Sequence, residues 1–295
     1  MKSIEKFFIE NKIPYEKEQS LDRYTTLGIG GLADFVLFPE EKDITKSIEA
    51  IKNEGIPYYI IGGGSNLLIS DRGFRGVIIN TRRLKMIELQ GNVLIVGGGV
   101  RLGRVLAFML KRGLSGMEGL IGIPGTVGGA VFGNAGSFGV EIKDCLEEIE
   151  LIDNELRIKT LRKNDINFQY RKSGLPENSL IVKAVFKLRD SSEDSYIKMR
   201  NYLQTKIKSQ PLTSRSAGCV FKNPEGTSAG YLIDKAGLKG TKIGDIVVSS
   251  IHANYFINTG RGSSSDFLKL MELVRERVLK VFSIELEPEI KFLEA

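Results

Sequence analysis

Several residue types that common enzyme chemistries depend on are scarce in this chain. Its 295 residues include no Trp, one His and two Cys. Zinc sites built from Cys and His, and iron–sulfur clusters, are therefore close to excluded, and no metal site is predicted. Catalysis by a Ser-His-Asp or Cys-His arrangement has one candidate base, His252. We expect this histidine to satisfy a local hydrogen bond instead.

Long apolar runs are missing as well. No run approaches the roughly 18–20 residues that a membrane-spanning helix needs, so no membrane span is predicted. The first residues carry Glu5, Lys6, Glu10 and Lys12 among the apolar positions, which does not fit a signal peptide. Two cysteines in such a chain indicate reduced thiols. These features predict a cytoplasmic protein.

The charge balance is moderately basic, with a formal net charge of +6 at pH 7. This charge is consistent with an ordinary basic surface or with attraction of anionic ligands. Nucleic acid is not the predicted partner, because the chain has no run of five Lys or Arg residues and no nucleic-acid-binding motif. A phosphorylated small molecule fits better, and no obligate protein partner is evident.

Glycine, in contrast, is in excess: 33 of 295 residues, against a background of about 7%. Gly62–Gly64 directly follows a predicted strand, where consecutive backbone N–H groups can form an anion-binding nest. The second loop, Gly122–Gly136, mixes glycine with small and apolar residues, which suits a flat cofactor that carries phosphates. Neither loop has the Rossmann or Walker pattern, and either one alone is also consistent with a structural turn.

The pattern along the chain predicts an α+β fold in three parts, residues 1–80, 81–190 and 191–295. Apolar periodicity indicates helices and strands, and Asp153-Asn154 is typical of a hairpin turn. The predicted helices are Asp43–Asn53, Leu102–Lys111, Tyr196–Lys208 and Ser264–Val281, besides a short one near the N-terminus. The predicted strands include Tyr58–Ile61, Val77–Asn80, Val93–Val96, Ser179–Leu188 and a final one over Glu285–Phe292.

Six short motifs follow one another along nearly the whole chain. They are Tyr24–Gly31 (YTTLGIGG), Ile61–Leu68 (IGGGSNLL), Gly119–Ala130 (GLIGIPGTVGGA), Gln169–Ser173 (QYRKS), Ala217–Pro224 (AGCVFKNP) and Leu286–Ile290 (LEPEI). Their order resembles that of the UDP-N-acetylenolpyruvoylglucosamine reductase (MurB) family. The short length resembles the compact type II subtype, which lacks an extra substrate-side loop.

The resemblance implies a flavoenzyme of peptidoglycan synthesis. It implies an FAD-binding fold of the vanillyl-alcohol-oxidase (PCMH) type in residues 1–80 and 81–190, and a C-terminal α+β substrate domain in residues 191–295. FAD is held noncovalently and is reduced by NADPH. The enolpyruvyl group of a UDP-sugar then receives hydride at C3 and a proton at C2. The implied cofactor residues are Thr26, Gly62, Gly63, Gly64, Ser65, Asn66, Gly122, Ile123, Pro124, Gly125, Thr126, Gly128, Gly129, Ala130 and Asn134.

The resemblance also implies the catalytic residues Arg171, Cys219 and Glu289. The planar donor fork of Arg171 suits the substrate carboxylate, and Glu289 as a neutral acid can donate a hydrogen bond to it. Cys219 stands where family members commonly have Ser. An ordinary thiol with a pKa near 8.5 is protonated at neutral pH and is a reasonable proton donor for C2. The implied substrate contacts are Tyr170, Lys208, Lys222 and Asn223.

Other interpretations stay open at this point. Taken singly, Cys219 reads as a small buried residue, Arg171 as part of a surface ion pair and Glu289 as a solvated charge. A different flavin oxidoreductase of the same fold, acting on a sugar or alcohol, is the alternative function, although such enzymes often attach FAD through an early His. A nonredox protein that binds a UDP-sugar is a third possibility, and bound flavin separates it from the others.

Overall fold

The computed structural model describes residues 1–294. The chain folds into two compact units, each described here by itself. Unit 1 comprises Met1–Lys17, Phe35–Gly63 and Gly76–Thr205, and unit 2 comprises Glu18–Asp34, Gly64–Arg75 and the chain from Lys206 onward. Helices and strands are interspersed throughout, as expected for the predicted α+β class. The division into three parts at residues 80 and 190 stays a prediction.

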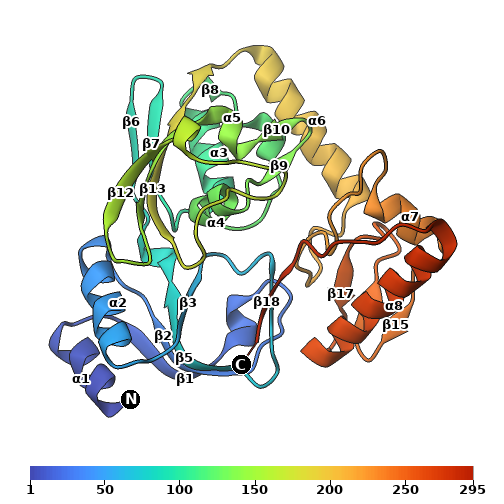
Figure 1. Ribbon diagram of the computed structural model, residues 1–295. Helices are drawn as coiled ribbons and strands as arrows, with labels where there is room; N and C mark the ends of the chain where they lie inside the picture. Colours follow the sequence, from blue (N-terminus) through green and yellow to red (C-terminus); the bar gives the residue numbers. More distant parts are fainter. Residues whose placement is uncertain (295) are drawn as a thin grey trace. The chain divides into compact units, whose positions relative to one another are not determined.

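The first layer of unit 1 contains α1 (Lys2–Glu10) and α2 (Ile44–Asn53), which lie beside a four-stranded sheet (Figure 1). The strand order is β1 (Tyr15–Ser20), β2 (Leu32–Leu37), β5 (Phe74–Asn80) and β3 (Tyr58–Ile61), with β3 parallel to β5. Alternate residues of β5, Val77 and Ile79, join the same core as Ile48 and Ile51 of α2. The period-2 pattern of the strand therefore turns one face toward the helices.

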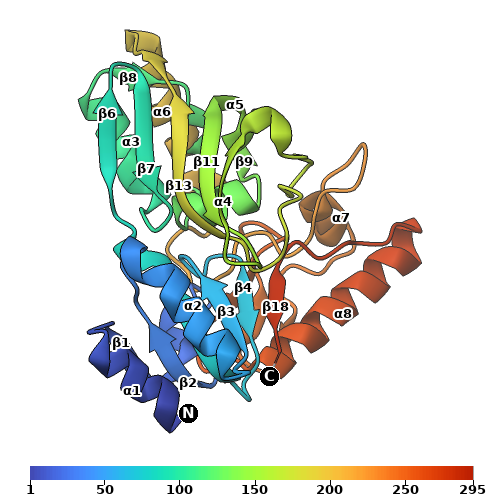
Figure 2. The ribbon, with the colours of Figure 1, turned by 60° about the vertical axis from the view of Figure 1, so that its left-hand side comes forward.

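The second layer of unit 1 is an antiparallel five-stranded sheet. Helices α3 (Leu102–Lys111) and α4 (Val127–Phe132) pack against it (Figure 2), and Leu106 and Phe186 are buried in their shared core. Gly113 follows α3 with a φ of +67°, the left-handed geometry in which many helices end. The strand order is β12 (Ile158–Arg162), β11 (Leu146–Ile152), β13 (Leu180–Lys187), β7 (Val93–Gly97) and β6 (Ile87–Gln90).

Shorter elements complete unit 1. They include α5 (Ile142–Cys145), the pair β8 (Leu114–Ser115) and β14 (Arg189–Asp190), and the pair β9 (Gly136–Ser137) and β10 (Val140–Glu141). The chain also forms 3-10 turns at Leu21–Tyr24, Glu41–Asp43, Thr81–Arg83, Glu118–Leu120 and Lys163–Asp165, the first of them in unit 2. Among the described helices, none combines the length and the apolar character needed to cross a bilayer.

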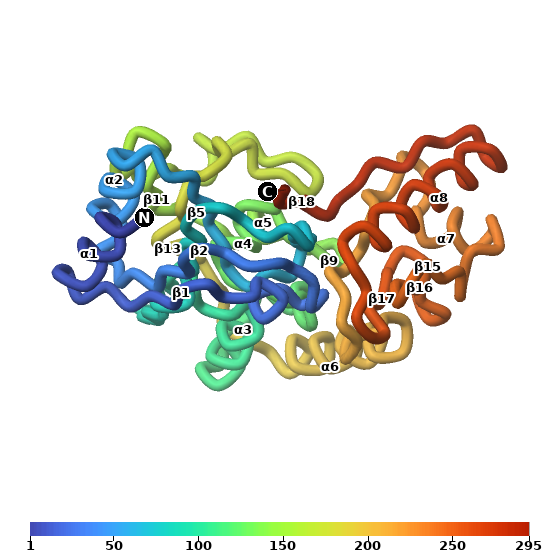
Figure 3. The backbone as a smooth tube through the Cα atoms, turned by 90° about the horizontal axis from the view of Figure 1, so that it is seen from below, coloured from blue at the N-terminus to red at the C-terminus, as the bar shows by residue number. Residues whose placement is uncertain are grey.

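Unit 2 has its own core, in which Phe256, Phe267 and Val274 are buried. Helices α7 (Ala229–Lys235) and α8 (Ser264–Phe282) lie near a small antiparallel sheet (Figure 3) of β15 (Lys242–Ile243), β16 (Ile246–Val248) and β17 (Phe256–Asn258). After α8 the chain runs to β18 (Lys291–Leu293), which pairs in parallel with β4 (Leu67–Ile69). This pairing brings the end of the chain to the strand that follows the Gly62–Gly64 loop.

Some predicted elements differ from the structure. The predicted final strand over Glu285–Phe292 is mostly wrong, because only Lys291–Leu293 is a strand and the preceding residues pair with the Cys219 segment. The helix predicted at Tyr196–Lys208 is present as α6 (Glu193–Ser209), but its apolar stripe is only partly buried. Met199 is 3% exposed, whereas Ile207 is 60% exposed. The strand β1 was not predicted, since its residues are mostly charged and polar.

Candidate active site

The two predicted cofactor loops meet within unit 1, at Gly62 and Gly63 on one side and Gly125 and Thr126 on the other. A Cβ added to Gly63 would lie 2.7 Å from the Cα of Gly125, and one added to Gly62 would overlap the hydroxyl of Thr126. Only glycine allows the loops this approach, since real Cβ atoms do not come so close. Thr126 caps α4, with its Oγ1 accepting from the Gly129 N–H at 3.4 Å.

Asn134 closes the second loop and is fully buried. Its Nδ2 donates to the Glu141 carboxylate and to the main-chain oxygen of Gln169, both at 2.9 Å. Its Oδ1 is buried and accepts no hydrogen bond from the described residues. A buried acceptor that receives no hydrogen bond lowers the stability of the fold. This oxygen is therefore suited to accept a hydrogen bond from a donor group on a ligand. Together with the glycine contact, it fits the extended cofactor that the sequence predicts.

The remaining predicted cofactor residues of unit 1 lie in the second loop, between residues 122 and 130. Gly122 and Gly125 have φ values of +74° and +110°, a backbone geometry that favours glycine. Thr126 and Ala130 are buried, whereas the other residues retain some exposure: Ile123, Pro124, Gly128 and Gly129.

In unit 2, the structure brings Thr26 against the other end of the first loop. The Thr26 N–H donates to the Gly64 oxygen at 3.1 Å, and its hydroxyl donates to the Ser216 oxygen at 2.7 Å. Gly64 has a φ of +60°, and a Cβ there would overlap the carbonyl of Tyr24. Three separate segments of the chain therefore join beside Gly64 and Ser65.

Cys219 and Glu289 are brought to neighbouring main-chain positions in unit 2. Antiparallel bridges join Cys219 to Tyr255 and Phe221 to Pro288. The Glu289 N–H donates to the main-chain oxygen of Val220 at 2.8 Å. Val220 directly follows Cys219 in the chain. Both predicted catalytic side chains are partly exposed. The thiol of Cys219 and the carboxyl group of Glu289 thus lie on two segments joined by main-chain contacts.

The first glycine loop is bonded to the same residue. The Asn66 side-chain Nδ2 donates to the main-chain oxygen of Glu289 at 3.1 Å, and the Lys291 N–H donates to the Asn66 oxygen at 3.1 Å. Glu289 is therefore held through its N–H by the Cys219 segment and through its carbonyl by the glycine loop.

Arg171 lies in unit 1, in a tight turn between Gln169 and Lys172. The turn is closed by two main-chain hydrogen bonds of 2.7 and 3.1 Å between these residues. Arg171 adopts a φ of +58°, which is uncommon for a residue with a side chain. Its Nη2 donates to the Gly136 oxygen at 2.9 Å, and its guanidinium carbon lies 4.9 Å from the centre of the Tyr170 ring. These contacts orient the donor fork.

The predicted substrate contacts have varied surroundings. Lys222 forms an ion pair with Glu287, and the Asn223 Oδ1 accepts from the Ala229 N–H at 3.1 Å, at the start of α7. Tyr170 is 45% exposed. Lys208 is exposed on α6. All four side chains therefore have at least some access to solvent.

His252 and Cys145 both have the surroundings of structural residues. The His252 Nδ1 accepts from the Asn254 N–H at 3.3 Å, so the expected local hydrogen bond is confirmed, and burial lowers the pKa of the imidazole. Burial raises the pKa of the Cys145 thiol to about 12. Sequence reasoning missed Asn254, a buried amide that contacts the Cys219 segment. The available signal was a single amide within the apolar run Ala253–Phe256.

Two family models match the chain. One is described as UDP-N-acetylenolpyruvoylglucosamine reductase, C-terminal domain, and matches residues 210–293. The other is an FAD binding domain and matches residues 33–162. The UDP-N-acetylenolpyruvoylglucosamine reductase of Caldicellulosiruptor saccharolyticus is 40% identical over 286 residues, which cover 95% of this chain and 92% of the relative. The enzyme of the same name from Carboxydothermus hydrogenoformans is 40% identical over 95% of this chain and 94% of the relative.

Solved structures agree with these matches. The crystal structure of UDP-N-acetylenolpyruvylglucosamine reductase (MurB) from Thermus caldophilus has a TM-score of 0.82 and 35% identity, and it covers 95% of this chain and 98% of its own. A glucooligosaccharide oxidase from Acremonium strictum has a TM-score of 0.53 at 16% identity, covering 94% of this chain and 58% of its own, and shows the fold alone. The implied FAD-binding fold of the vanillyl-alcohol-oxidase type with an added C-terminal domain is therefore confirmed.

Proposed function

Because this chain belongs to the UDP-N-acetylenolpyruvoylglucosamine reductase (MurB) family, we propose that it reduces UDP-N-acetylglucosamine enolpyruvate to UDP-N-acetylmuramate for peptidoglycan synthesis. FAD is the cofactor and NADPH the hydride donor. The observation that carries the proposal is the position of Glu289, whose main chain bonds both to Val220, next to Cys219, and to Asn66 of the glycine loop. A proton donor, a carboxyl group and a cofactor loop are then parts of one hydrogen-bonded assembly.

The FAD site is formed by the glycine loops. Bound there, FAD would supply the hydride chemistry that links NADPH to C3 of the enolpyruvyl group. The close approach of Gly63 to Gly125 and the buried Oδ1 of Asn134 support cofactor binding on the unit 1 side. Backbone N–H groups of both loops would donate hydrogen bonds to the phosphates of FAD. The full proposed set is Thr26, Gly62, Gly63, Gly64, Ser65, Asn66, Gly122, Ile123, Pro124, Gly125, Thr126, Gly128, Gly129, Ala130 and Asn134.

Arg171 binds the carboxylate of the enolpyruvyl group. Addition of hydride at C3 moves negative charge onto this carboxylate, so a fixed cation stabilises the transition state more than the ground state. The bond from Nη2 to Gly136 and the Tyr170 ring hold the fork before substrate arrives. Because guanidinium N–H groups donate in one plane, Arg171 can bind both carboxylate oxygens.

Glu289 and Cys219 complete the reaction. Glu289, as a neutral acid, donates a hydrogen bond to the same developing negative charge. The Cys219 thiol gives its proton to C2, which forms the new C–H bond, and the thiolate is then reprotonated from solvent. Cys219 is partly exposed, so solvent can return this proton.

The UDP moiety is bound by two lysine side chains and one asparagine amide. We assign its diphosphate and sugar to Lys208, Lys222 and Asn223, and we place Tyr170 beside the substrate. Lys222 is paired with Glu287 in the structure, so phosphate would compete with a carboxylate for this ammonium group. A net charge of +6 supports attraction of such an anion.

We further assign residues 1–80 and 81–190 to FAD binding and residues 191–295 to substrate binding. The family models, which match residues 33–162 and 210–293, support this division. We place the enzyme in the cytoplasm, and the UDP-sugar and NADPH are its only proposed partners.

The test combines an absorption spectrum with a substrate assay. We expect the purified protein to contain bound FAD. Its absorption spectrum should then show the band at roughly 450 nm that is typical of an oxidised flavin. It should oxidise NADPH rapidly only when UDP-N-acetylglucosamine enolpyruvate is present. A protein that binds UDP-sugars but takes up no FAD contradicts the proposal. Turnover with free sugars or alcohols instead of the enolpyruvyl substrate would favour the alternative oxidoreductase.

A further inference from the structure

The Cys219–Lys222 segment is held differently on its two sides. On the Glu289 side, main-chain hydrogen bonds continue past Phe221 to Lys222, whose N–H donates to the Glu287 oxygen at 2.8 Å. On the other side, the N–H of Val220 donates to the main-chain oxygen of Asn254 at 2.8 Å. Beyond that bond, a side chain takes the place of a paired strand.

That side chain is the amide of Asn254. Its Oδ1 accepts from the Phe221 N–H at 2.9 Å, and its Nδ2 donates to the Phe221 oxygen at 2.7 Å. Asn254 is 1% exposed, so neither Phe221 group can exchange this partner for bulk water without local opening. The carboxamide supplies one donor and one acceptor in one plane, as a peptide group does. Asp lacks the donor and Ala lacks both groups.

The effect of this contact reaches Cys219 through a short path. Cys219 and Tyr255 form a bridge whose flanking bond is Val220 N–H to Asn254 oxygen, the pattern of a non-hydrogen-bonded antiparallel pair. Side chains of such a pair lie close together on one face. Fixing Phe221 therefore fixes the direction of the strand that presents Cys219.

The same contact also affects the position of Glu289. The Glu289 N–H donates to the main-chain oxygen of Val220, one residue before Phe221. A shift of the Val220–Phe221 peptide would move the acceptor that holds Glu289. Asn254 is itself anchored, since its N–H donates to His252 Nδ1 at 3.3 Å.

We propose that Asn254 is a positioning residue for the reduction of the enolpyruvyl group: its amide holds Phe221 and thereby sets where Cys219 and Glu289 lie. The proposal rests on the proposed function for its kinetic consequence, but its geometric part stands independently. Asn254 contacts neither of the proposed cofactor loops through these bonds, so its loss affects the enolpyruvyl half of the reaction and spares flavin reduction by NADPH.

The test uses two variants and a matched control in the full-length flavoprotein. Asn254→Asp has nearly the same shape and keeps the acceptor, and Asn254→Ala removes both groups. The control is Ser249→Ala, which removes a buried Oγ that accepts from the N–H groups of Ile251 and His252 at 3.1 and 3.2 Å. Ser249 lies in the same turn, 2% exposed, and its hydroxyl bonds stay within that turn.

The first measurement follows the two half-reactions by stopped flow. We expect flavin reduction by NADPH to change less than about 2-fold and reoxidation by the enolpyruvyl substrate to slow by about 10- to 100-fold in the Asn254 variants, the scale expected for misplaced catalytic groups. Ser249→Ala should lower the melting temperature without changing the ratio of the two rates. Equal losses in both half-reactions, or a pattern matching Ser249→Ala, overturn the proposal.

The second measurement needs no turnover. Iodoacetamide alkylation of Cys219 is followed from pH 6 to pH 10 by mass spectrometry of the peptide that contains it, with the buried Cys145 as an internal slow thiol. In both Asn254 variants we expect the rate–pH curve of Cys219 to differ from that of the wild type, and in Ser249→Ala to coincide with it. Unchanged curves overturn the geometric part. If the wild-type protein fails to reduce the enolpyruvyl substrate, the proposed function is wrong, and these curves still decide the role of Asn254.

Discussion

The side-chain amide of Asn66 donates a hydrogen bond to the main-chain carbonyl of Glu289, with 3.1 Å between Nδ2 and oxygen. The parallel pairing of β18 with β4, which sets Lys291 opposite Leu67, brings the two residues together. A residue predicted to bind the cofactor and a residue predicted to act on the substrate therefore share one contact. A movement of the glycine loop at Asn66 would therefore also move the main chain that carries the Glu289 carboxyl group.

Replacement of Asn66 tests this coupling. In Asn66→Ala we expect kcat for enolpyruvyl reduction to fall by about 10-fold at saturating FAD, since one hydrogen bond that fixes Glu289 is lost, equivalent to roughly 1.4 kcal/mol in the barrier. The measurement is steady-state NADPH oxidation at several FAD concentrations. If excess FAD restores wild-type kcat, Asn66 serves only cofactor binding and its bond to Glu289 has no kinetic role.

The contact between the two glycine loops gives a second prediction. In Gly63→Ala, the new Cβ would lie 2.7 Å from the Cα of Gly125, so the loops must separate. We expect FAD affinity to fall by at least about 10-fold, since glycine is what permits this close backbone approach. Titration of the apoprotein with FAD, followed at 450 nm or by flavin fluorescence, measures the change.

Gly103 supplies the matched control for Gly63. It lies within α3, and a Cβ added there has nothing within 4 Å. Gly103→Ala should bind FAD normally and gain about 0.5–1 kcal/mol of stability, because alanine favours the helix. Equal FAD affinity in Gly63→Ala and Gly103→Ala would show that the loops do not bind the cofactor.

The proposed acid role of Cys219 predicts different pH profiles for two variants. Cys219→Ser should retain much of the activity, and Cys219→Ala should reduce the flavin with NADPH yet lose enolpyruvyl reduction. An ordinary thiol loses its proton near pH 8.5, whereas a hydroxyl does not. We therefore expect the wild-type rate to fall at alkaline pH and the Cys219→Ser rate to persist. Normal turnover by Cys219→Ala would exclude the acid role.

Local structure could be predicted from the sequence wherever one segment carries its own signal. The helix Leu102–Lys111 follows from its apolar spacing, and it ends before a glycine, Gly113, that takes the left-handed geometry. The final strand could not be predicted well, because Glu287–Glu289 pairs with Lys222 and Val220 far away in the chain. A segment shows the same alternation of apolar and polar side chains whether it pairs with a neighbouring strand along its whole length or only at isolated bridges.

The candidate site shows the same division. Motif order made Cys219 and Glu289 the predicted catalytic residues, but the hydrogen bond between their segments joins residues far apart in the chain, which periodicity does not predict. Asn254 was missed because a lone amide in an apolar run is not part of a motif. Its role depends on its two hydrogen bonds to the main chain of Phe221, a residue distant in sequence. The exposure of Ile207 was missed for a similar reason, since a helical stripe predicts a face but not whether another element covers it.

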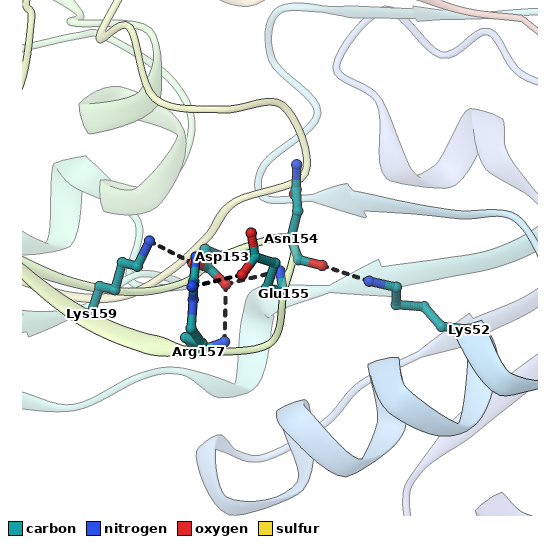
Figure 4. Close-up of polar contacts among 6 residues, drawn as sticks. All are labelled: Lys52, Asp153, Asn154, Glu155, Arg157 and Lys159. Carbon is teal, nitrogen blue, oxygen red and sulfur yellow. Dashed lines mark hydrogen bonds and ion pairs between the residues drawn. The ribbon is translucent and has the colours of Figure 1, made fainter.

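The predicted hairpin at Asp153-Asn154 joins β11 to β12 and supplies a prediction about stability (Figure 4). One oxygen of Asp153 accepts from the N–H groups of Glu155 and Arg157, each at 2.9 Å, and the other lies 2.7 Å from the Lys159 ammonium. The adjacent Asn154 carbonyl accepts from Lys52 of α2. These contacts hold the pKa of Asp153 well below its ordinary value. The hydrogen bond from Lys159 is the largest cause, and the turn's N–H groups and the Arg157 side chain add to it.

This lowered pKa fixes the sign of the pH dependence. The unfolded chain takes up a proton on Asp153 near its ordinary pKa of about 4, whereas the folded protein takes it up only at lower pH. The stabilisation from Asp153 is therefore present above about pH 4 and is lost as the pH falls further. In Asp153→Asn we expect lower stability than wild type at pH 7, and a difference that shrinks between about pH 5 and pH 3.

Urea unfolding at a series of pH values measures this difference, with Glu155→Gln as the control. Glu155 is paired with Arg157 but its side chain is 68% exposed, so its removal should change the free energy of unfolding by no more than about 0–1 kcal/mol. A pH-independent gap between wild type and Asp153→Asn would mean that shape, rather than the carboxylate charge, sets the turn. A loss in Glu155→Gln as large as that in Asp153→Asn would assign the stabilisation to the general charge pattern of the hairpin instead of to the buried Asp153 contacts.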